Sequence, residues 1–285
     1  MPLISTALTA VFGVLLSLVA ASAAAQERIV SADGAITEII FALDADDQLA
    51  GVDTTSHYPP DGVAALPKVG YLRALPLEGV LSLQPTRLIT TTEAGPAKTI
   101  ERIRDAGVQV VQLPVALSAD SALERITNVG QLVHREAASE KLVATLRDQI
   151  DQVKLQMQGK SGARVLFLLA AGDHGVMLAG TGTSADALLT SLGLVNAVPE
   201  ASGYKPASRE ALLVSSPDAI VVAEARPGQF REQDWPALTR LPAWQNGHRL
   251  TTNAMFLLGF GPRLADAMKA VADIVPAGET TADAR

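Results

Sequence analysis

The chain has 285 residues, of which 48% are hydrophobic and 19% are charged. A chain of this length and composition can bury a large core and is expected to form two lobes, which excludes a disordered or fibrous protein. Its formal net charge of −7 argues against nucleic acid and anionic membranes as partners. The sequence contains no cysteine, so disulfides, thiolate metal sites and a cysteine-linked lipid anchor are not expected.

The first 25 residues predict a secretory signal peptide. They carry no charged side chain, and a short apolar run at residues 11–20 is followed by small residues at 21–25. The run is shorter than the ~20 residues that a membrane span needs, so a signal cleaved near Ala23 or Ala25 is favoured over an anchor. The positive charge of its n-region must come from the free amino terminus. We therefore expect a mature protein free in a periplasm-like compartment, with no direct membrane insertion after cleavage.

An N-terminal α/β lobe is expected at residues 26–118, because apolar runs alternate there with helical patterns. The predicted strands are at residues 29–31, 49–52, 88–90 and 108–111, and the predicted helices at 35–43 and 97–106. Gly107 follows the second helix, as glycine often does at a helix end.

Tyr71 and Arg73 form a Y-x-R pattern in the segment 66–73 of this lobe. Residues two apart in an extended segment point to the same side, so both side chains can face one cleft. A free tyrosine has a pKa near ~10, and its phenolate is scarce at neutral pH unless iron or a nearby cation stabilises it. Tyrosinate is one of the few protein ligands of haem iron. On its own the pattern is weak, because a half-buried tyrosine is more often a packing residue.

A helical connector is expected at residues 119–160. Within it, a long amphipathic helix is predicted from residue 135 to about residue 157, because apolar side chains repeat at intervals of three and four residues: Leu142, Leu146, Ile150, Val153 and Met157. At 1.5 Å per residue such a helix would reach ~35 Å, enough to run along the back of two lobes. A strand at residues 165–169 then begins the C-terminal lobe, which is expected at residues 161–285.

Two segments, 78–89 and 210–221, share the pattern E-x-[VL]-L-x-x-x-P-x-x-[LI]-[IV]. Each predicts a short helix, a proline stop and a buried strand. The six matched positions indicate two related lobes, with Glu78 and Glu210 at equivalent helix starts. The alternative is that such helices are common, and that the helix dipole favours glutamate near any helix start.

With these segments in view, the chain resembles the periplasmic solute-binding proteins of bacterial ABC importers, and most of all their haem-binding members. The resemblance covers nearly the whole mature chain and rests on these segments: Arg28-Ile29-Val30-Ser31, Thr55-Ser56-His57-Tyr58-Pro59-Pro60, residues 66–73, Glu78-Gly79-Val80-Leu81, residues 177–183, Ser208-Arg209-Glu210 and residues 258–263. It implies two Rossmann-like lobes joined by one long helix, with the ligand cleft between the lobes. It also implies that Tyr71 is the axial ligand of ferric haem, that Arg73 supports it, and that Glu78 and Glu210 meet arginines on the membrane permease.

Further candidate residues follow from the needs of haem, a flat apolar disc with two carboxylates. His174 and Arg226 each follow a predicted strand, where open α/β sheets bind ligands. His174 is a candidate second axial ligand or porphyrin contact, and the alternative is a solvated loop residue. Arg226 and Arg73 are candidate partners of the carboxylates. The candidate apolar walls are Met177, Met255, Phe256, Leu257 and Phe260.

The other three histidines are weaker candidates. His57 borders the cleft or belongs to a turn, and the turn is favoured because two prolines follow shortly after it. His134 and His248 are expected at the surface.

A dinucleotide site is a competing hypothesis. Residues 180–185 match the fingerprint G-x-G-x-x-A, and Glu200 lies where a ribose-binding acid would be expected. The match is short, and Thr183 or Ser184 is more simply the N-cap of a helix through Leu188 and Leu189. No H-E-x-x-H, G-x-S-x-G, P-loop or EF-hand sequence is present.

The favoured function is therefore a non-enzymatic receptor that captures ferric haem and delivers it to an ABC permease. The first alternative is the same fold binding an iron-siderophore or a corrinoid, with Tyr71 as a wall residue. The second is a secreted dinucleotide-dependent enzyme. Whether one or two haems bind is left open.

Overall fold

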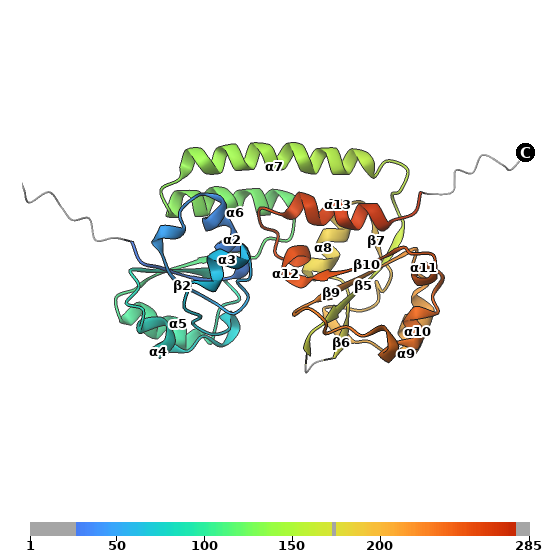
Figure 1. Cartoon of the computed structure of the whole chain (residues 1–285), viewed down its shortest axis with the longest axis horizontal. Helices are drawn as coiled ribbons and strands as arrows, with labels where there is room; N and C mark the ends of the chain where they lie inside the picture. The colour runs from blue at the N-terminus through green and yellow to red at the C-terminus, as the bar shows by residue number, and fades with distance from the viewer. Residues whose placement is uncertain (1–26, 173–174, 278–285) are drawn as a thin grey trace, which may run out of the picture.

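The computed structural model describes residues 27–172 and 175–277, which form two α/β lobes side by side (Figure 1). The signal peptide predicted at residues 1–25 lies outside the described residues. None of the helices in the described ranges is both long enough and apolar enough to cross a bilayer.

The N-terminal lobe is built on a four-stranded parallel sheet with the order β2-β1-β3-β4. Its strands are β1 (Ile29–Ala32), β2 (Leu49–Val52), β3 (Arg87–Thr91) and β4 (Gln109–Leu113). Its helices are α2 (Gly34–Ala42), α3 (Pro60–Ala64), α4 (Leu77–Leu81) and α5 (Ala97–Asp105), with short 3-10 helices η1 (Asp46–Gln48) and η2 (Leu72–Ala74). All four residues of β1 are buried, as expected of a parallel strand covered on both faces. The strands and helices predicted for this lobe are confirmed.

The C-terminal lobe contains a six-stranded sheet with the path β10-β9-β5-β6-β8, and β7 pairs with β5. Its strands are β5 (Arg164–Ala170), β6 (Val176–Ala179), β7 (Val195–Asn196), β8 (Tyr204–Pro206), β9 (Ala219–Glu224) and β10 (Arg249–Asn253). Its helices are α8 (Ser184–Ser191), α9 (Arg209–Ser215), η4 (Glu232–Asp234), α10 (Pro236–Thr239), α11 (Pro242–Gln245), α12 (Ala254–Leu258) and α13 (Leu264–Ile274). Strands β6 and β8 are antiparallel additions.

The two lobes repeat one arrangement of parallel strands. The neighbours β1-β3-β4 in one sheet correspond to β5-β9-β10 in the other. A short helix precedes the second strand of each trio, α4 before β3 and α9 before β9. This topology agrees with the related lobes that the repeated sequence pattern predicts.

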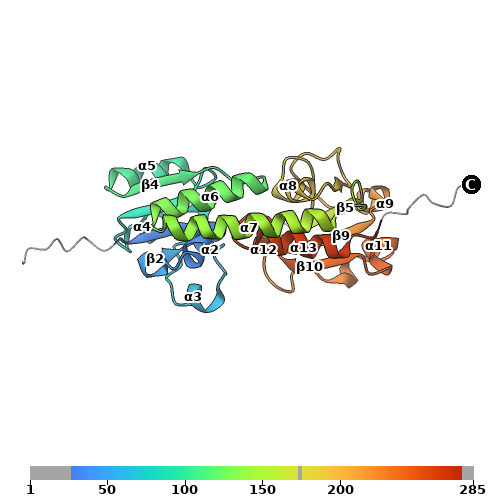
Figure 2. The same ribbon diagram turned by 90° about the horizontal axis from the view of Figure 1, so that it is seen from above.

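Two helices join the lobes, α6 (Ala119–Leu132) and α7 (Glu136–Gln156). The predicted long helix is confirmed as α7, which packs against α6 and α13 and runs over both lobes (Figure 2). Its side chains at Leu146, Ile150 and Val153 are buried. They belong to one continuous apolar cluster that also contains strands and helices of both lobes. The lobes therefore share a core along the back of the molecule.

Polar contacts also join the lobes. Arg263, at the start of α13, donates from Nε and Nη2 to the carboxylate of Glu38 in α2, at 2.9 and 2.5 Å. Buried Arg125 of α6 donates to the carbonyl oxygens of Gly259 and Phe260. Burial raises the pKa of Glu38, and the hydrogen bond from Arg263 offsets part of that rise. We call these contacts of Glu38, Arg125 and Arg263 the interlobe bridge.

Candidate functional site

Tyr71 and Arg73 come together as predicted, although the backbone between them differs from the prediction. Tyr71 has an extended conformation, but Arg73 lies in the 3-10 helix η2 that begins at the next residue. The turn brings Arg73 Nη1 to 2.7 Å from the Tyr71 phenol oxygen, to which it donates a hydrogen bond. The Tyr71 side chain is 42% exposed, so its oxygen lies beside a cation and remains accessible to a ligand.

The segment that carries Tyr71 is fixed to the sheet and to the adjacent core. Val69 donates a 2.9 Å backbone hydrogen bond to Val52, and Thr54 donates one of 2.8 Å to Gly70. Gly70 has a φ of +105°, and a Cβ there would lie 2.7 Å from Cδ of Pro76, so this position requires glycine. The backbone conformation and the close approach of Pro76 therefore explain the glycine before Tyr71.

Glu93 is a member of the site that the sequence did not single out. It forms an ion pair with Arg73 through the guanidinium Nη2. Burial lowers the pKa of Arg73, but the contacts with Tyr71 and Glu93 outweigh burial and raise it overall. Glu93 lies just beyond β3. The strand-end criterion that selected His174 and Arg226 would have found it.

Residues of the C-terminal lobe also lie near the site. Burial raises the pKa of the Tyr204 phenol in β8, while Arg73 opposes the rise and Glu93 adds to it. Tyr204 is 36% exposed, and its phenol lies within electrostatic reach of Arg73. The sequence did not single out this residue.

The predicted cation Arg226 lies near His57, for which the sequence favours a turn role over a place at the cleft border. Burial lowers the pKa of His57, and the positive charges of Lys68 and Arg226 lower it further. Lys68, which the sequence did not single out, donates from Nζ to the Ser56 carbonyl at 2.7 Å. Arg226 is exposed. Cations from both lobes therefore gather around His57.

The predicted apolar wall divides into two groups. Phe260 is only 1% exposed and Leu257 is fully buried, both inside the shared core, so the wall role predicted for them is wrong. Phe260 adopts a φ of +53°, and its side chain packs in that core. Met255, Phe256 and Met177 are half-buried and keep some exposed surface.

Phe256 lies beside the interlobe bridge. The Arg263 guanidinium is 5.3 Å from the Phe256 ring centroid and 3.9 Å from that of Tyr58. Tyr58 is 44% exposed and gives the bridge an accessible aromatic face.

The other predicted histidines have varied positions. His174 lies outside the described residues. His134 is exposed, as predicted, whereas His248 is half-buried with Nδ1 3.1 Å from the carbonyl oxygen of Ile274. In the parts of the chain that the structure describes, no group of three or more His, Cys, Asp or Glu side chains could hold a metal ion.

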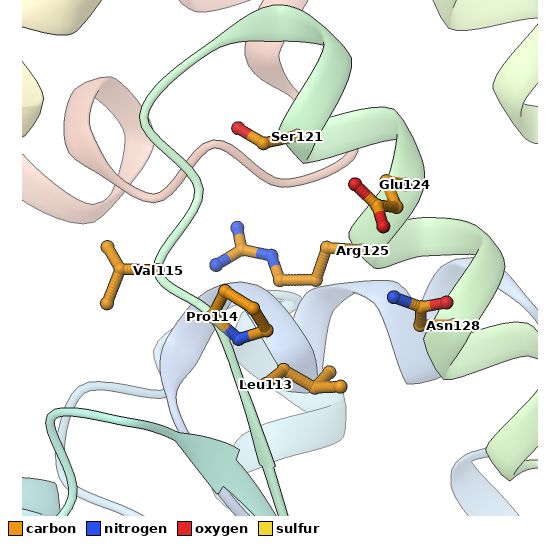
Figure 3. A pocket seen from close by; sticks show the side chains of 7 residues that line it. All are labelled: Leu113, Pro114, Val115, Ser121, Glu124, Arg125 and Asn128. Carbon is orange, nitrogen blue, oxygen red and sulfur yellow. The ribbon is translucent and has the colours of Figure 1, made fainter.

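A small cavity of about 30 Å³ lies beside α6. Figure 3 shows the Arg125 side chain reaching from α6 toward the loop of Pro114 and Val115. Arg125 Nε is buried without a hydrogen-bond partner, and the volume suits about one water molecule. The cavity is far too small for haem and belongs to the interlobe bridge.

The glycine-rich turn at residues 180–185 has a structural explanation. It follows β6, which is antiparallel to β5, whereas the dinucleotide fingerprint requires a parallel strand–helix–strand unit. Thr183 is the N-cap of α8 and accepts from the Asp186 N–H at 3.2 Å. A Cβ at Gly180 would lie 2.1 Å from the carbonyl oxygen of Ala201. The geometry therefore supports close backbone packing and a capped helix.

Glu78 and Glu210 occupy the first turns of α4 and α9, and both are exposed. Figure 1 shows α4 and α9 on the same side of the molecule, away from α7. One flat partner could therefore contact both lobes on this side.

Known proteins share both the sequence and this architecture. The periplasmic heme-binding protein RhuT from Roseiflexus sp. RS-1, in apo form, is 32% identical with a TM-score of 0.79, over 88% of this chain and 100% of that chain. The periplasmic heme-binding protein HutB of Vibrio cholerae is 32% identical with a TM-score of 0.75, over 88% and 99%. A vitamin B12-binding protein of Vibrio parahaemolyticus is 24% identical over 85% of this chain and 86% of its own length. Residues 29–255 match the periplasmic binding protein family, and the chain belongs to that family.

Proposed function

We propose that this solute-binding protein of an ABC importer carries ferric haem, with the Tyr71 phenolate as axial ligand. One observation carries the proposal: an exposed phenol oxygen accepts a 2.7 Å hydrogen bond from the Arg73 guanidinium. The Arg73 guanidinium is thus held beside this oxygen, and a tyrosine oxygen is one of the few protein ligands of haem iron. The relatives named as heme-binding proteins support the same ligand.

The surroundings of Tyr71 suit the rest of the haem molecule. Lys68 and Arg226 are exposed cations that can pair with the two carboxylates. Tyr58, Met255 and Phe256 retain exposed apolar surface that can contact the porphyrin face. The iron, the two carboxylates and the porphyrin face of haem thus each have a proposed partner in this protein.

An absorbance titration of the purified protein with haemin tests this proposal. We expect the wild type to give a saturable Soret change and a tyrosinate-to-iron charge-transfer band, and the end point gives the number of haems bound. Tyr71→Phe removes the ligand oxygen but keeps the ring, so the band should disappear and the affinity should fall at least tenfold, about 1.4 kcal/mol. The matched control is Tyr58→Phe, which should keep the band. Unchanged binding in Tyr71→Phe would refute the assignment.

A corrinoid is the second candidate ligand, because relatives of similar length are named vitamin B12-binding proteins. In that case Tyr71 would serve as an aromatic wall, and Tyr71→Phe would leave the affinity almost unchanged. A parallel titration with cyanocobalamin separates the two ligands. A ferric siderophore, the remaining alternative, is tested by the same titration with a ferric catecholate or hydroxamate.

Delivery to the permease is proposed to use Glu78 and Glu210, one on each lobe. Their exposure and their position on one side of the molecule support simultaneous contact with two cationic sites of the permease.

A further inference from the structure

A single guanidinium connects a carboxylate to the proposed iron ligand. Arg73 contacts Glu93 through Nη2 and donates to the Tyr71 oxygen through Nη1. Because the guanidinium is planar and rigid, fixing one of its nitrogens also fixes the direction of the other. The orientation of the N–H that faces the phenol therefore depends on Glu93.

The backbone holds the two partners of this ion pair in register. Gly95 N–H donates to the Leu72 carbonyl at 2.9 Å, and Leu75 N–H donates to the Gly95 carbonyl at 2.8 Å. These reciprocal hydrogen bonds join the loop of Glu93 to the turn of Arg73. Leu72, Leu75 and Ala94, which neighbour the two residues in the chain, belong to one buried apolar cluster. The arrangement of Arg73 and Glu93 is therefore fixed by the backbone and the core and does not require a ligand.

The ion pair is poorly suited to a purely structural role. The side chains of Arg73 and Glu93 are 53% and 46% exposed, and exposed ion pairs contribute little to folding. Removing Glu93 should therefore affect the phenol much more than the fold.

We propose that Glu93 is a positioning residue for the ligand-binding phenol and holds Arg73 in the orientation in which Nη1 donates to Tyr71. This inference rests on the proposed function, since the role of the phenol as an iron ligand is itself proposed. Glu93 has two effects. Its carboxylate oxygen accepts from the guanidinium and so fixes the donor that faces Tyr71, and its negative charge pairs with Arg73.

These two effects can be separated by two substitutions. Glu93→Ala removes both the acceptor and the charge, so Arg73 loses its orientation. Glu93→Gln removes the charge but keeps an oxygen that can accept from the guanidinium. The matched control is Asp273→Ala, which removes an exposed ion pair of 2.7 Å with Lys269 on α13.

The first measurement needs no ligand. The chain has three tyrosines, so the NMR spectrum of the unliganded protein labelled with 13C at tyrosine Cζ contains three signals, which single Phe substitutions assign. In Glu93→Ala the Tyr71 signal should move toward its position in Arg73→Ala, whereas Glu93→Gln and the control should keep it near the wild-type position. An unmoved Tyr71 signal in Glu93→Ala overturns the proposal.

The second measurement is haemin affinity with the charge-transfer band. Glu93→Ala should weaken binding roughly two- to fivefold, the change expected for loss of an exposed ion pair, and Glu93→Gln should restore it. If wild type binds haemin and Glu93→Ala matches it in affinity and spectrum, the proposal is overturned. If wild type does not bind haemin, the proposed function fails, and the NMR result alone decides whether Glu93 positions Arg73.

Discussion

The three tyrosines of the chain have different neighbours, and these neighbours determine what each phenol can do. The Tyr71 oxygen accepts from Arg73, whereas the Tyr58 ring face lies 3.9 Å from the Arg263 guanidinium. A cation beside the oxygen lies where an iron-bound tyrosinate would carry its charge, whereas a cation over the ring stabilises an aromatic surface. Burial raises the pKa of Tyr204, which keeps that phenol protonated. Tyr71 is therefore the phenol best prepared to bind ferric iron.

Asp53 is expected to make stability depend on pH. It is completely buried at the end of β2, and burial raises its pKa from 3.8 to about 6 despite hydrogen bonds from Thr55 and Ser56. The folded protein holds this proton more tightly than the unfolded chain. The resulting stabilisation is fully present below about pH 3.8 and is lost as the pH rises through about 6. The difference amounts to about 3 kcal/mol.

The test compares urea unfolding of the wild type and Asp53→Asn at about pH 3.5, 5 and 7. The unfolding free energy of the variant should rise relative to wild type by about 3 kcal/mol across this range, because asparagine does not titrate. Parallel pH profiles would show that Asp53 has the same pKa in the folded protein as in the unfolded chain.

Which site residues could be predicted depended on their separation in the sequence. Tyr71 and Arg73 are two positions apart, so local geometry alone suggested their contact. Glu93 follows a predicted strand, but its contact with Arg73, 20 residues away, depends on the order of the strands, and the proximity of Tyr204 depends on how the two lobes pack. Phe260 was misassigned because an apolar residue near a predicted site gives no sign of whether it faces the core or a ligand.

Helices were predicted well where the apolar side chains repeat regularly or where a glycine marks the helix end. The stripe of α7 and the glycine after α5 gave those helices almost to the residue. Antiparallel β6 and β8 were not predicted, because alternating strands and helices indicate a parallel sheet. The glycine-rich turn at residues 180–185 matched a nucleotide motif because the sequence does not show that the strand before it is antiparallel.

Gly180 offers a direct test of that turn. A Cβ at this position would lie 2.1 Å from a carbonyl oxygen, so Gly180→Ala must displace the backbone near Ala201. We expect the unfolding free energy to fall by about 1–3 kcal/mol, the usual cost of overpacking. Gly182→Ala is the comparison, since that site has open space and only a φ of +75° to oppose the substitution. Urea unfolding measures both, and a smaller loss at Gly180 than at Gly182 would contradict the packing explanation.

The corresponding helices α4 and α9, one in each lobe, carry the proposed contact with the permease. Exposed ion pairs contribute only ~0.2–1 kcal/mol each, so Glu78→Ala or Glu210→Ala alone should weaken haem-dependent growth modestly. Reversing both charges to Arg should abolish it, because each arginine would face a like charge on the permease. Haemin binding by the purified variants should remain normal. Full growth of the double reversal, or lost haemin binding, would refute the docking role.

For the whole molecule, the alternation of strands and helices was enough to predict two lobes and a helical spine. It gave no sign of the interlobe bridge, because Arg263 and Glu38 are 225 residues apart and their contact depends on how the two lobes pack. The bridge and the shared core join the lobes next to α7. We therefore expect the Glu38–Arg263 ion pair to contribute to the relative orientation of the lobes.

The Glu38–Arg263 pair allows this expectation to be tested. Glu38 is 6% exposed, so Arg263→Met leaves a buried carboxylate without its cation and should lower the unfolding free energy by about 3 kcal/mol. Glu38→Gln should cost less, since Arg263 is 24% exposed and keeps a neutral acceptor. The double variant should recover part of the loss, because no charge is then left unpaired. Urea unfolding gives these energies, and small-angle X-ray scattering reports the separation of the lobes. The control is Lys269→Met, which breaks an exposed pair on α13. An Arg263→Met loss no larger than the ~0–1 kcal/mol expected of this control, with unchanged scattering, would show that the ion pair does not hold the lobes in place.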